Sequence, residues 1–323
     1  MTVRARLYDA RGDDRDVDIA EIEPGKIDDK SLLWIDADSD DEAHIDGIAR
    51  AVGLEPQLVR VLAAEQRRPR LVRLPDRVAV TLSAIDRRGS GEDGLVHCEL
   101  DVLLGRNLVI TVHDGPLTAI RQFSEQVRHE QELGLLDAGA FMTGLVDAVL
   151  TAYVAEVEMI EAEIDRLDQI ALRSTTDQDD FLARIVDLRR RIGILRRWLA
   201  PNRDAITPLV RPDFELHGDI ATAWPGLAER LERVIGQVEN TRELLVGSFD
   251  VYMGRSAQRS NDVMKTLTIV SAILLPSVVL AGVMGMNFKV PFFDNPGNFF
   301  VVVGAMLAFA IAILVVARWR HWI

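Results

Sequence analysis

Carboxylate side chains crowd one long predicted helix and the polar segment that follows it. Six acids fall between residues 156 and 168, and three more fall between residues 177 and 180. Carboxylate oxygens bind divalent cations, and neighbouring carboxylates repel one another unless a cation lies between them. The segment either binds such an ion or forms a solvated acidic helix face that keeps the protein soluble. The acids are Glu156, Glu158, Glu161, Glu163, Asp165, Asp168, Asp177, Asp179 and Asp180.

Other candidate residues for chemistry are few. The tripeptide Gly285-Met286-Asn287 ends a long uncharged run, but taken alone Gly-x-Asn is also common at the end of a helix. Cys98 follows His97, yet no second Cys or His pair is spaced to complete a metal site, so we expect Cys98 in the core of a strand. The sequence contains no Gly-rich phosphate loop, GxSxG elbow or HExxH motif, and its histidines are scattered. We therefore expect no enzyme and no cofactor.

Two uncharged apolar stretches dominate the end of the chain, at residues 267–286 and 299–317. A helix needs about 20 apolar residues to cross a bilayer core, so both stretches qualify as membrane spans. A pair of buried core helices is the alternative, but such helices seldom lack any charge over this length. The short segment between them contains Pro291, Pro296 and Gly297, which predicts a hairpin.

Charge is divided unevenly along the 323 residues. The whole chain has a net charge of −13, whereas residues 255–323 contain six bases and two acids and carry +4, so residues 1–254 carry −17. The bases flank the two spans on one side, and the positive-inside rule then places both termini in the cytoplasm. The N-terminal residues contain no apolar signal-peptide region, and the chain has a single cysteine. Both features agree with a cytosolic location for the acidic residues 1–254. The composition excludes a disulfide scaffold, a low-complexity chain and a basic nucleic-acid binder.

Residues 1–135 alternate short β-like runs with helical spacing, which predicts a compact α/β domain. Long helices are expected after it, over 140–173 and 178–210, and a third runs without a breaker from Gly226 to Met286. That third helix would be about 90 Å long, and since no monomer could bury one face of it, several copies should pack side by side. Strands are expected at 4–8, 32–36, 77–85, 96–104 and 107–114, and shorter helices at 41–52, 56–65 and 116–133.

A characteristic set of residues lies in and just before the first span: Asn261, Met264-Lys265, Leu267-Thr268, Pro276 and Gly285-Met286-Asn287. In these residues and in its layout the chain resembles the CorA family of divalent-cation transporters, the two-span family with a GMN motif that includes the ZntB zinc transporters. The resemblance implies a homopentamer in which Asn287 amide oxygens converge on the pore axis. Neutral oxygens suit Mg²⁺, which gives up its water shell reluctantly.

The resemblance implies an α+β membrane protein with a cytosolic domain, a stalk and a two-helix hairpin. Its parts would be a cytosolic α/β domain at 1–135, long antiparallel helices at 136–225 and a stalk helix at 226–266. The first span would cover 267–287, the external loop 288–298, the second span 299–317 and a cytosolic tail 318–323. The expected location is the inner or plasma membrane, and the expected partners are further copies of the chain, divalent cations and the lipid bilayer, without nucleic acid.

Helical spacing back from Asn287 predicts the residues that line the pore. Apolar rings would close a pore by dewetting, and polar rings would touch a hydrated ion. Helix–helix packing is an equally open alternative for each position. The predicted lining is Asp250, Asn261, Met264, Leu267, Ser271, Leu275, Val278 and Gly282, below a filter of Gly285, Met286 and Asn287.

The main hypothesis is transport of Mg²⁺, with Co²⁺ and Ni²⁺, through a homopentameric pore. Zn²⁺ transport is the alternative, because Met284 stands where magnesium-type relatives usually have Tyr and the loop contains Lys289 and a single acid, Asp294. A membrane-anchored ion sensor is a third hypothesis. No titratable side chain lies inside either span, which argues against a proton relay there. In this family cytosolic cations bridge acids between subunits, a regulatory role open to the nine acids above.

Overall fold

The computed structural model describes residues 2–9, 14–19, 22, 27, 31–38, 42–54, 68–74, 77–88, 94–129, 138–172, 178–210, 224–286, 297–320 and 322. The chain divides into two compact units. The first unit contains residues 1–170 and 175–248, and the second contains residues 171–174 and 249–323.

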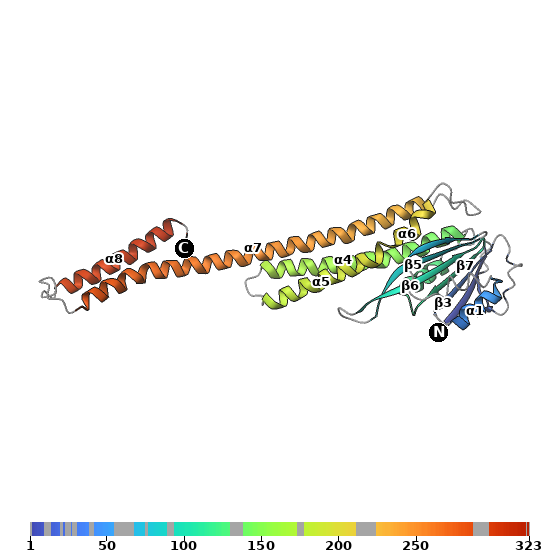
Figure 1. Cartoon of the computed structure of the whole chain (residues 1–323), viewed down its shortest axis with the longest axis horizontal. Helices are drawn as coiled ribbons and strands as arrows, with labels where there is room; N and C mark the ends of the chain where they lie inside the picture. The colour runs from blue at the N-terminus through green and yellow to red at the C-terminus, as the bar shows by residue number, and fades with distance from the viewer. Residues whose placement is uncertain are drawn as a thin grey trace. The chain divides into compact units, whose positions relative to one another are not determined.

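A seven-stranded mixed sheet lies at the centre of the first unit (Figure 1). Its strand order is β2-β1-β3-β7-β6-β5-β4, with β3 and β7 parallel and the other neighbouring pairs antiparallel. All five expected strands are present. The sequence did not reveal β2 and β4, because two and four residues are too short to show an alternating pattern. The strands are β1 (Thr2–Asp9), β2 (Arg15–Asp16), β3 (Ser31–Asp38), β4 (Arg70–Arg73), β5 (Val78–Arg87), β6 (Leu95–Leu104) and β7 (Leu108–His113).

Helices cover both faces of this sheet. On one face, Ile48 of α1 (Glu42–Ala51) and Val52, just after this helix, are buried against strand residues that include Ile35 and Ile110. On the other face, α3 (Thr118–His129) and α4 (Ala138–Leu172) bring Phe123 and Phe141 against Trp34, with ring centroids 4.9–6.0 Å apart. The N-terminal α/β domain expected from the sequence is therefore confirmed. The helix expected at 56–65 lies outside the described residues.

An asparagine from a short helix completes the edge of β5. Strand β4 begins at Arg70, opposite Thr81, and so cannot pair with Ser83. The backbone N–H of Ser83 instead donates to Asn202 Oδ1 at 2.8 Å, and Asn202 Nδ2 donates to the Ser83 carbonyl at 3.0 Å. The buried Asn202 side chain thus replaces a missing strand, which fixes α6 (Asn202–Ile206) against the sheet.

Long helices extend from the sheet, and α4, α5 (Gln178–Leu199) and the first part of α7 (Trp224–Met284) run side by side in Figure 1. The single helix expected over 178–210 is wrong. It breaks after Leu199 because Pro201 has no N–H to continue the ladder, and the chain restarts as α6 and a 3₁₀ turn, η5 (Thr207–Val210). The uninterrupted helix expected from Gly226 is present as α7 (Trp224–Met284), which has 61 residues.

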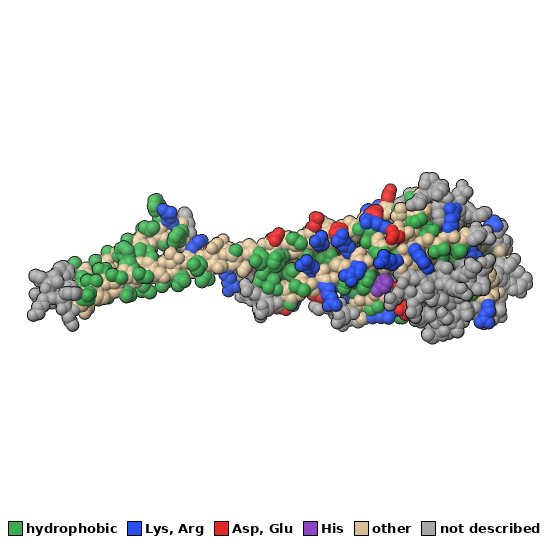
Figure 2. Space-filling model, in the orientation of Figure 1, with side chains coloured by type: hydrophobic (Ala, Val, Ile, Leu, Met, Phe, Trp, Pro, Cys, Tyr) green, Lys and Arg blue, Asp and Glu red, His purple; other side chains and the backbone are tan. Residues whose placement is uncertain are grey.

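The second unit consists mainly of the later part of α7 and of α8 (Gly297–Trp319). Three described helices are long and apolar enough to cross a membrane, namely α4, α7 and α8. Half of the apolar stretch of α4 is buried inside the first unit, whereas the apolar stretches of α7 and α8 remain exposed. Figure 2 shows hydrophobic side chains along the side of α8 that faces the viewer. This pattern makes α4 a core helix and leaves α7 and α8 as the membrane spans.

Candidate functional site

The Gly-Met-Asn tripeptide lies at the end of α7. The Gly285 N–H still donates to the carbonyl four residues earlier, that of Ala281, at 2.9 Å. The Met286 N–H donates to the carbonyl only three residues earlier, that of Val283, at 3.2 Å, so the helix ends in a tighter turn. Asn287 itself lies outside the described residues, together with Lys289, Pro291, Asp294 and the rest of the loop before α8.

Gly285 does not end the helix by adopting the left-handed conformation. Among the described glycines, positive φ angles occur at Gly53 and Gly115 only. A Cβ added at Gly285 would lie 3.4 Å from the Ala281 carbonyl oxygen and 3.5 Å from that of Gly282, which are ordinary contact distances. The fold of one chain would therefore accept a side chain at position 285, and a left-handed glycine cap does not account for the residue.

The eight residues predicted to line a pore lie on exposed faces of α7. We call them the pore stripe: Asp250, Asn261, Met264, Leu267, Ser271, Leu275, Val278 and Gly282. The four large apolar members, Met264, Leu267, Leu275 and Val278, are 57–66% exposed. By contrast Ile269, which points towards α8, is 8% exposed. The packing of α8 on α7 thus leaves the pore stripe exposed, although Leu267, Ser271 and Leu275 border an open hollow beside Phe309 of α8.

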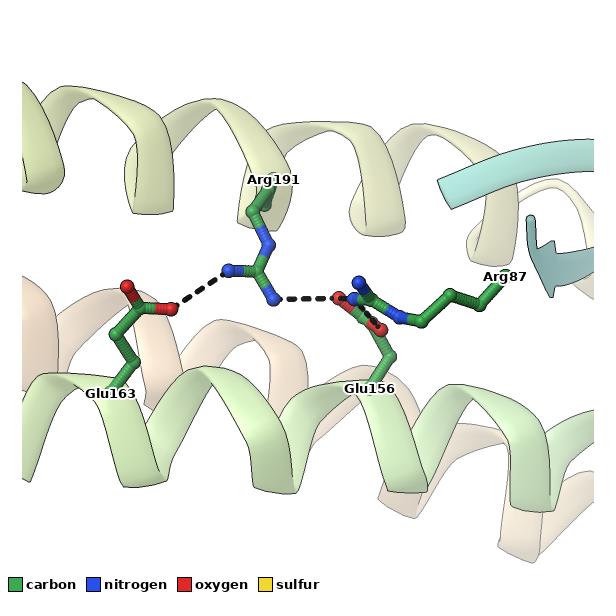
Figure 3. A network of polar contacts seen from close by, with 4 residues as sticks. All are labelled: Arg87, Glu156, Glu163 and Arg191. Atoms are coloured by element: carbon green, nitrogen blue, oxygen red, sulfur yellow. Dashed lines mark hydrogen bonds and ion pairs between the residues drawn. The ribbon is translucent and has the colours of Figure 1, made fainter. Parts of the chain in front are cut away.

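The crowded acids of α4 do not form a single solvated face, which was one of the two arrangements that the sequence left open. Glu156 is buried, and it accepts hydrogen bonds from two arginines of other elements (Figure 3). Arg87 Nη2 in β5 lies 2.6 and 2.5 Å from the two Glu156 carboxylate oxygens, and Arg191 Nη2 in α5 lies 2.9 Å from one of them. Arg191 Nη1 donates to Glu163 at 3.0 Å. This four-residue group is an internal ion network that joins β5, α4 and α5.

The charges in this network stabilise one another. Burial disfavours the charged form of Arg191, but its hydrogen bonds to Glu156 and Glu163 outweigh that cost and raise the pKa of Arg191 above its ordinary value. Both carboxylates are thereby engaged with guanidinium groups. The sequence contained one hint of these partners, the basic run from Arg189 to Arg191 on the neighbouring helix. Nothing in the sequence pointed to Arg87, which is 69 residues away from Glu156.

The remaining acids have several environments. Glu161 accepts a hydrogen bond from the Thr241 hydroxyl at 2.8 Å, and Asp180 lies 3.3 Å from Arg184. Asp168 is half-buried, whereas Glu158 and Asp165 are exposed. Asp177 and the side chain of Asp179 lie outside the described residues. Across the described part of the chain, no group of three or more His, Cys, Asp or Glu side chains is placed to hold a metal ion.

Cys98 is a core residue of β6, as expected. It is 1% exposed, and burial raises the pKa of its thiol to about 11. The neighbouring His97 has its Nε2 atom 2.6 Å from the Ser83 hydroxyl oxygen, and its ring packs against Trp198 of α5. His97 therefore belongs to the packing between the sheet and α5, whereas Cys98, the next residue of β6, points to the opposite face of the sheet.

Comparison with known proteins identifies a family. The family model described as CorA-like Mg²⁺ transporter protein matches residues 29–318 of this chain. The cobalt/magnesium transport protein CorA of Thermotoga maritima is 25% identical over 230 residues, which cover 70% of this chain and 64% of that protein. The zinc transport protein ZntB of Klebsiella pneumoniae is 25% identical over 306 residues, covering 91% of this chain and 88% of that protein. This chain spans about half to two thirds of the length of the first curated relatives that it matches.

A solved structure extends the likeness to the whole fold. The complete structure of the CorA magnesium transporter from Methanocaldococcus jannaschii superposes with a TM-score of 0.77 and covers 100% of both chains at 22% sequence identity. The sheet domain, the long helices and the two C-terminal apolar helices therefore recur together in that protein.

Proposed function

Because this chain belongs to the CorA-like Mg²⁺ transporter family, we propose that it carries divalent cations across a membrane through a pore formed by several copies of itself. The observation that supports this most directly is the pore stripe. Its large apolar side chains are more than half exposed in a single chain, and they lie on a helix long and apolar enough to cross a membrane. Because lipid tails also accept apolar side chains, this exposure leaves the face available to further copies, and the polar Ser271 on the same face favours contacts between copies over contact with lipid.

The pore proposal follows from symmetry and helix geometry. Residues at intervals of three or four lie on one face of α7, so a ring of copies would repeat each of them around a common axis. Met264, Leu267, Leu275 and Val278 would then form apolar constrictions, and Asn261, Ser271 and Asp250 would form polar rings. Five copies are expected from the family resemblance.

The filter proposal concerns the end of α7. Each copy would contribute the amide oxygen of Asn287, and the ring of neutral oxygens would hold a hydrated divalent ion by its water shell. Gly285 supports this arrangement. The fold of a single chain does not require glycine at this position, and the absence of a side chain would let the backbones of neighbouring copies approach one another closely.

The membrane orientation is proposed from charge. Arg255, Arg259 and Lys265 precede the apolar part of α7, and Arg318 and Arg320 follow that of α8. Basic residues favour the cytoplasmic side, so we place the first unit and both termini in the cytoplasm and the filter on the opposite side.

We assign Mg²⁺, with Co²⁺ and Ni²⁺, as the first choice of ion and Zn²⁺ as the second. The family description favours Mg²⁺, and the neutral Asn287 suits an ion that keeps its water. Two features favour Zn²⁺: Met284 instead of a tyrosine immediately before the tripeptide, and similarity to a zinc transport protein over most of the chain.

Ion uptake into proteoliposomes tests the proposal. The full chain is reconstituted, and entry of Mg²⁺, Co²⁺ and Zn²⁺ is followed with ion-sensitive dyes beside protein-free vesicles. We expect saturable uptake with Mg²⁺ fastest. Faster uptake of Zn²⁺ would favour the zinc assignment, and vesicles that take up none of the three ions would instead support a membrane-anchored sensor.

We further propose that exposed acids of α4 bind regulatory cations between copies. Glu156 and Glu163 are engaged with arginines, which leaves Glu158 and Asp165 as the exposed acids of this helix. They are seven residues apart on one face, about 10 Å along the axis, so one ion with ligands about 2–2.6 Å away cannot join them. Since no three acids of the described chain are placed to hold a metal ion, either acid would need oxygen ligands from a second copy.

Limited proteolysis of the first unit measures this regulation. We expect millimolar Mg²⁺ to slow cleavage of the full-length protein, and the double substitution Glu158→Gln with Asp165→Asn to remove most of that protection. The matched control is Asp180→Asn, an exposed acid that pairs with Arg184 in its own helix and should leave the protection intact. Equal protection of the double variant and the parent would exclude these two acids as the ion ligands.

A further inference from the structure

An apolar groove lies between the two membrane helices. Its volume is about 460 Å³, within the range of about 300–1,000 Å³ found for small-molecule sites. Ile269 and Ala272 of α7 and Phe309 and Ala312 of α8 line it, and Arg320 and Trp322 stand at one end. All of these residues belong to the second unit.

The shape of the groove comes from small side chains beside large ones. Ala272 and Ala312 leave space between the helices, and Phe309 forms a wall. A second, more open hollow of about 600 Å³ shares Ala272 and Phe309 with the first, but Leu267, Ser271 and Leu275 of the pore stripe also line it, so we confine the site to the first groove. From Phe309 to Arg320 the first groove follows α8 for about 16 Å. The groove is therefore elongated along the helix and lined by apolar side chains over most of its length, which suits a hydrocarbon chain.

The charge at its end is positive. Arg320 lines the groove, and within the described chain no acid is paired with its guanidinium group. Trp322 lines the same end and is 46% exposed, and tryptophan side chains favour the level of the lipid headgroups. Neither hollow has an acidic residue in its lining. A ligand that fills this site should therefore combine an apolar chain with an anionic group.

We propose that the groove binds one acyl chain of an anionic phospholipid, whose phosphate is held by Arg320 beside Trp322. The inference rests on the membrane placement in the proposed function and adds a specific lipid to it. A zwitterionic lipid would fit the groove equally well, but its headgroup carries no net charge for the basic end to attract. Basic residues near a membrane surface attract anionic lipids, with an effect of about fivefold in affinity for each residue.

Native mass spectrometry of the delipidated, detergent-solubilised full chain tests the site. Phosphatidylglycerol or phosphatidylcholine is added, and the molecules retained per subunit are counted. We expect the parent to retain phosphatidylglycerol preferentially and Arg320→Gln to weaken this retention about fivefold. Arg318→Gln is the matched control, because it removes a neighbouring base that does not line the groove. Equal losses in the two variants would exclude Arg320 as the headgroup ligand.

A second pair of variants tests the acyl-chain site. Ala312→Phe should fill the groove and abolish retention of both lipids, whereas Ala308→Phe places the same ring on an exposed position of α8 outside the lining and should not. Unchanged retention in Ala312→Phe would overturn the site. If this variant changes only the number of subunits in the spectrum, a second copy occupies the groove and the lipid proposal is wrong. Because lipid counting does not depend on ion flux, a parent that transports ions but retains no phosphatidylglycerol would defeat this inference alone.

Discussion

Asn287→Ala is expected to reduce divalent-cation uptake into proteoliposomes by more than about tenfold. A hydrogen bond to a charged group contributes about 1.5–3 kcal/mol, and a symmetric pore would lose one amide oxygen from every copy at once. The hydrated ion would then lose the ring of oxygens that holds its water shell, while the apolar constrictions below would be unchanged. The measurement is the initial uptake rate of Mg²⁺ at equal amounts of reconstituted protein.

The control for this prediction is Asn298→Ala. Asn298 lies in the first turn of α8 and outside the predicted filter, so its loss should leave the uptake rate close to that of the parent. Asn287→Gln, which keeps the amide but moves it outward by one methylene, should retain more activity than alanine. If the alanine variant takes up Mg²⁺ as fast as the parent, Asn287 does not form the filter and instead ends the helix.

Glu156→Ala is expected to destabilise the protein by about 3 kcal/mol. Removing one partner of a buried ion pair leaves uncompensated charge, and here two arginine side chains, only 12% and 32% exposed, would be left beside a cavity. For a folded unit of this size the loss corresponds to a decrease in melting temperature of roughly 6–12 °C. Circular dichroism of the full chain in detergent gives this value.

Glu158→Ala is the matched control for the ion network. It removes the same side chain two positions further along α4, where the carboxylate is exposed, and should change stability by no more than about 0.5 kcal/mol. Glu156→Gln keeps the hydrogen-bond acceptor but not the charge and should lie between the two. Equal melting temperatures for Glu156→Ala and the parent would show that the network with Arg87 and Arg191 does not stabilise the fold.

Much of the fold could be predicted because its signals are local. Alternating apolar residues identify the long strands, and two uncharged runs identify the membrane helices. Signals that are short or that depend on contacts were missed. The two-residue β2 is too short to show an alternating pattern. The prediction of one helix over 178–210 did not take account of Pro201, although this residue is evident in the sequence. Here the proline, not the surrounding helical spacing, determined where the helix ended.

The candidate sites were predictable to different degrees. The spacing of the pore stripe placed its members on one helix face, and the structure leaves that face exposed. The acids illustrate the opposite case, because sequence spacing cannot distinguish Glu156 from Glu158. One faces inward to Arg191, 35 residues away, and the other faces outward. Only the packing of α5 and β5 on α4 separates a buried ionic cluster from a solvated surface.

Proline at position 276 gives α7 an uneven bending stiffness. The helix is continuous through this residue, but the ladder lacks the hydrogen bond that an amide at 276 would donate, and the Ser277 hydroxyl adds a bond to the Ile273 carbonyl at 3.0 Å, a contact that tends to bend helices. Residues 277–285 then act as a lever about 12–14 Å long. A bend of about 10° at its base would move Gly285 sideways by about 2 Å, roughly the length of one metal–oxygen bond. The mouth of a pore could thus change width while the rest of α7 keeps its shape.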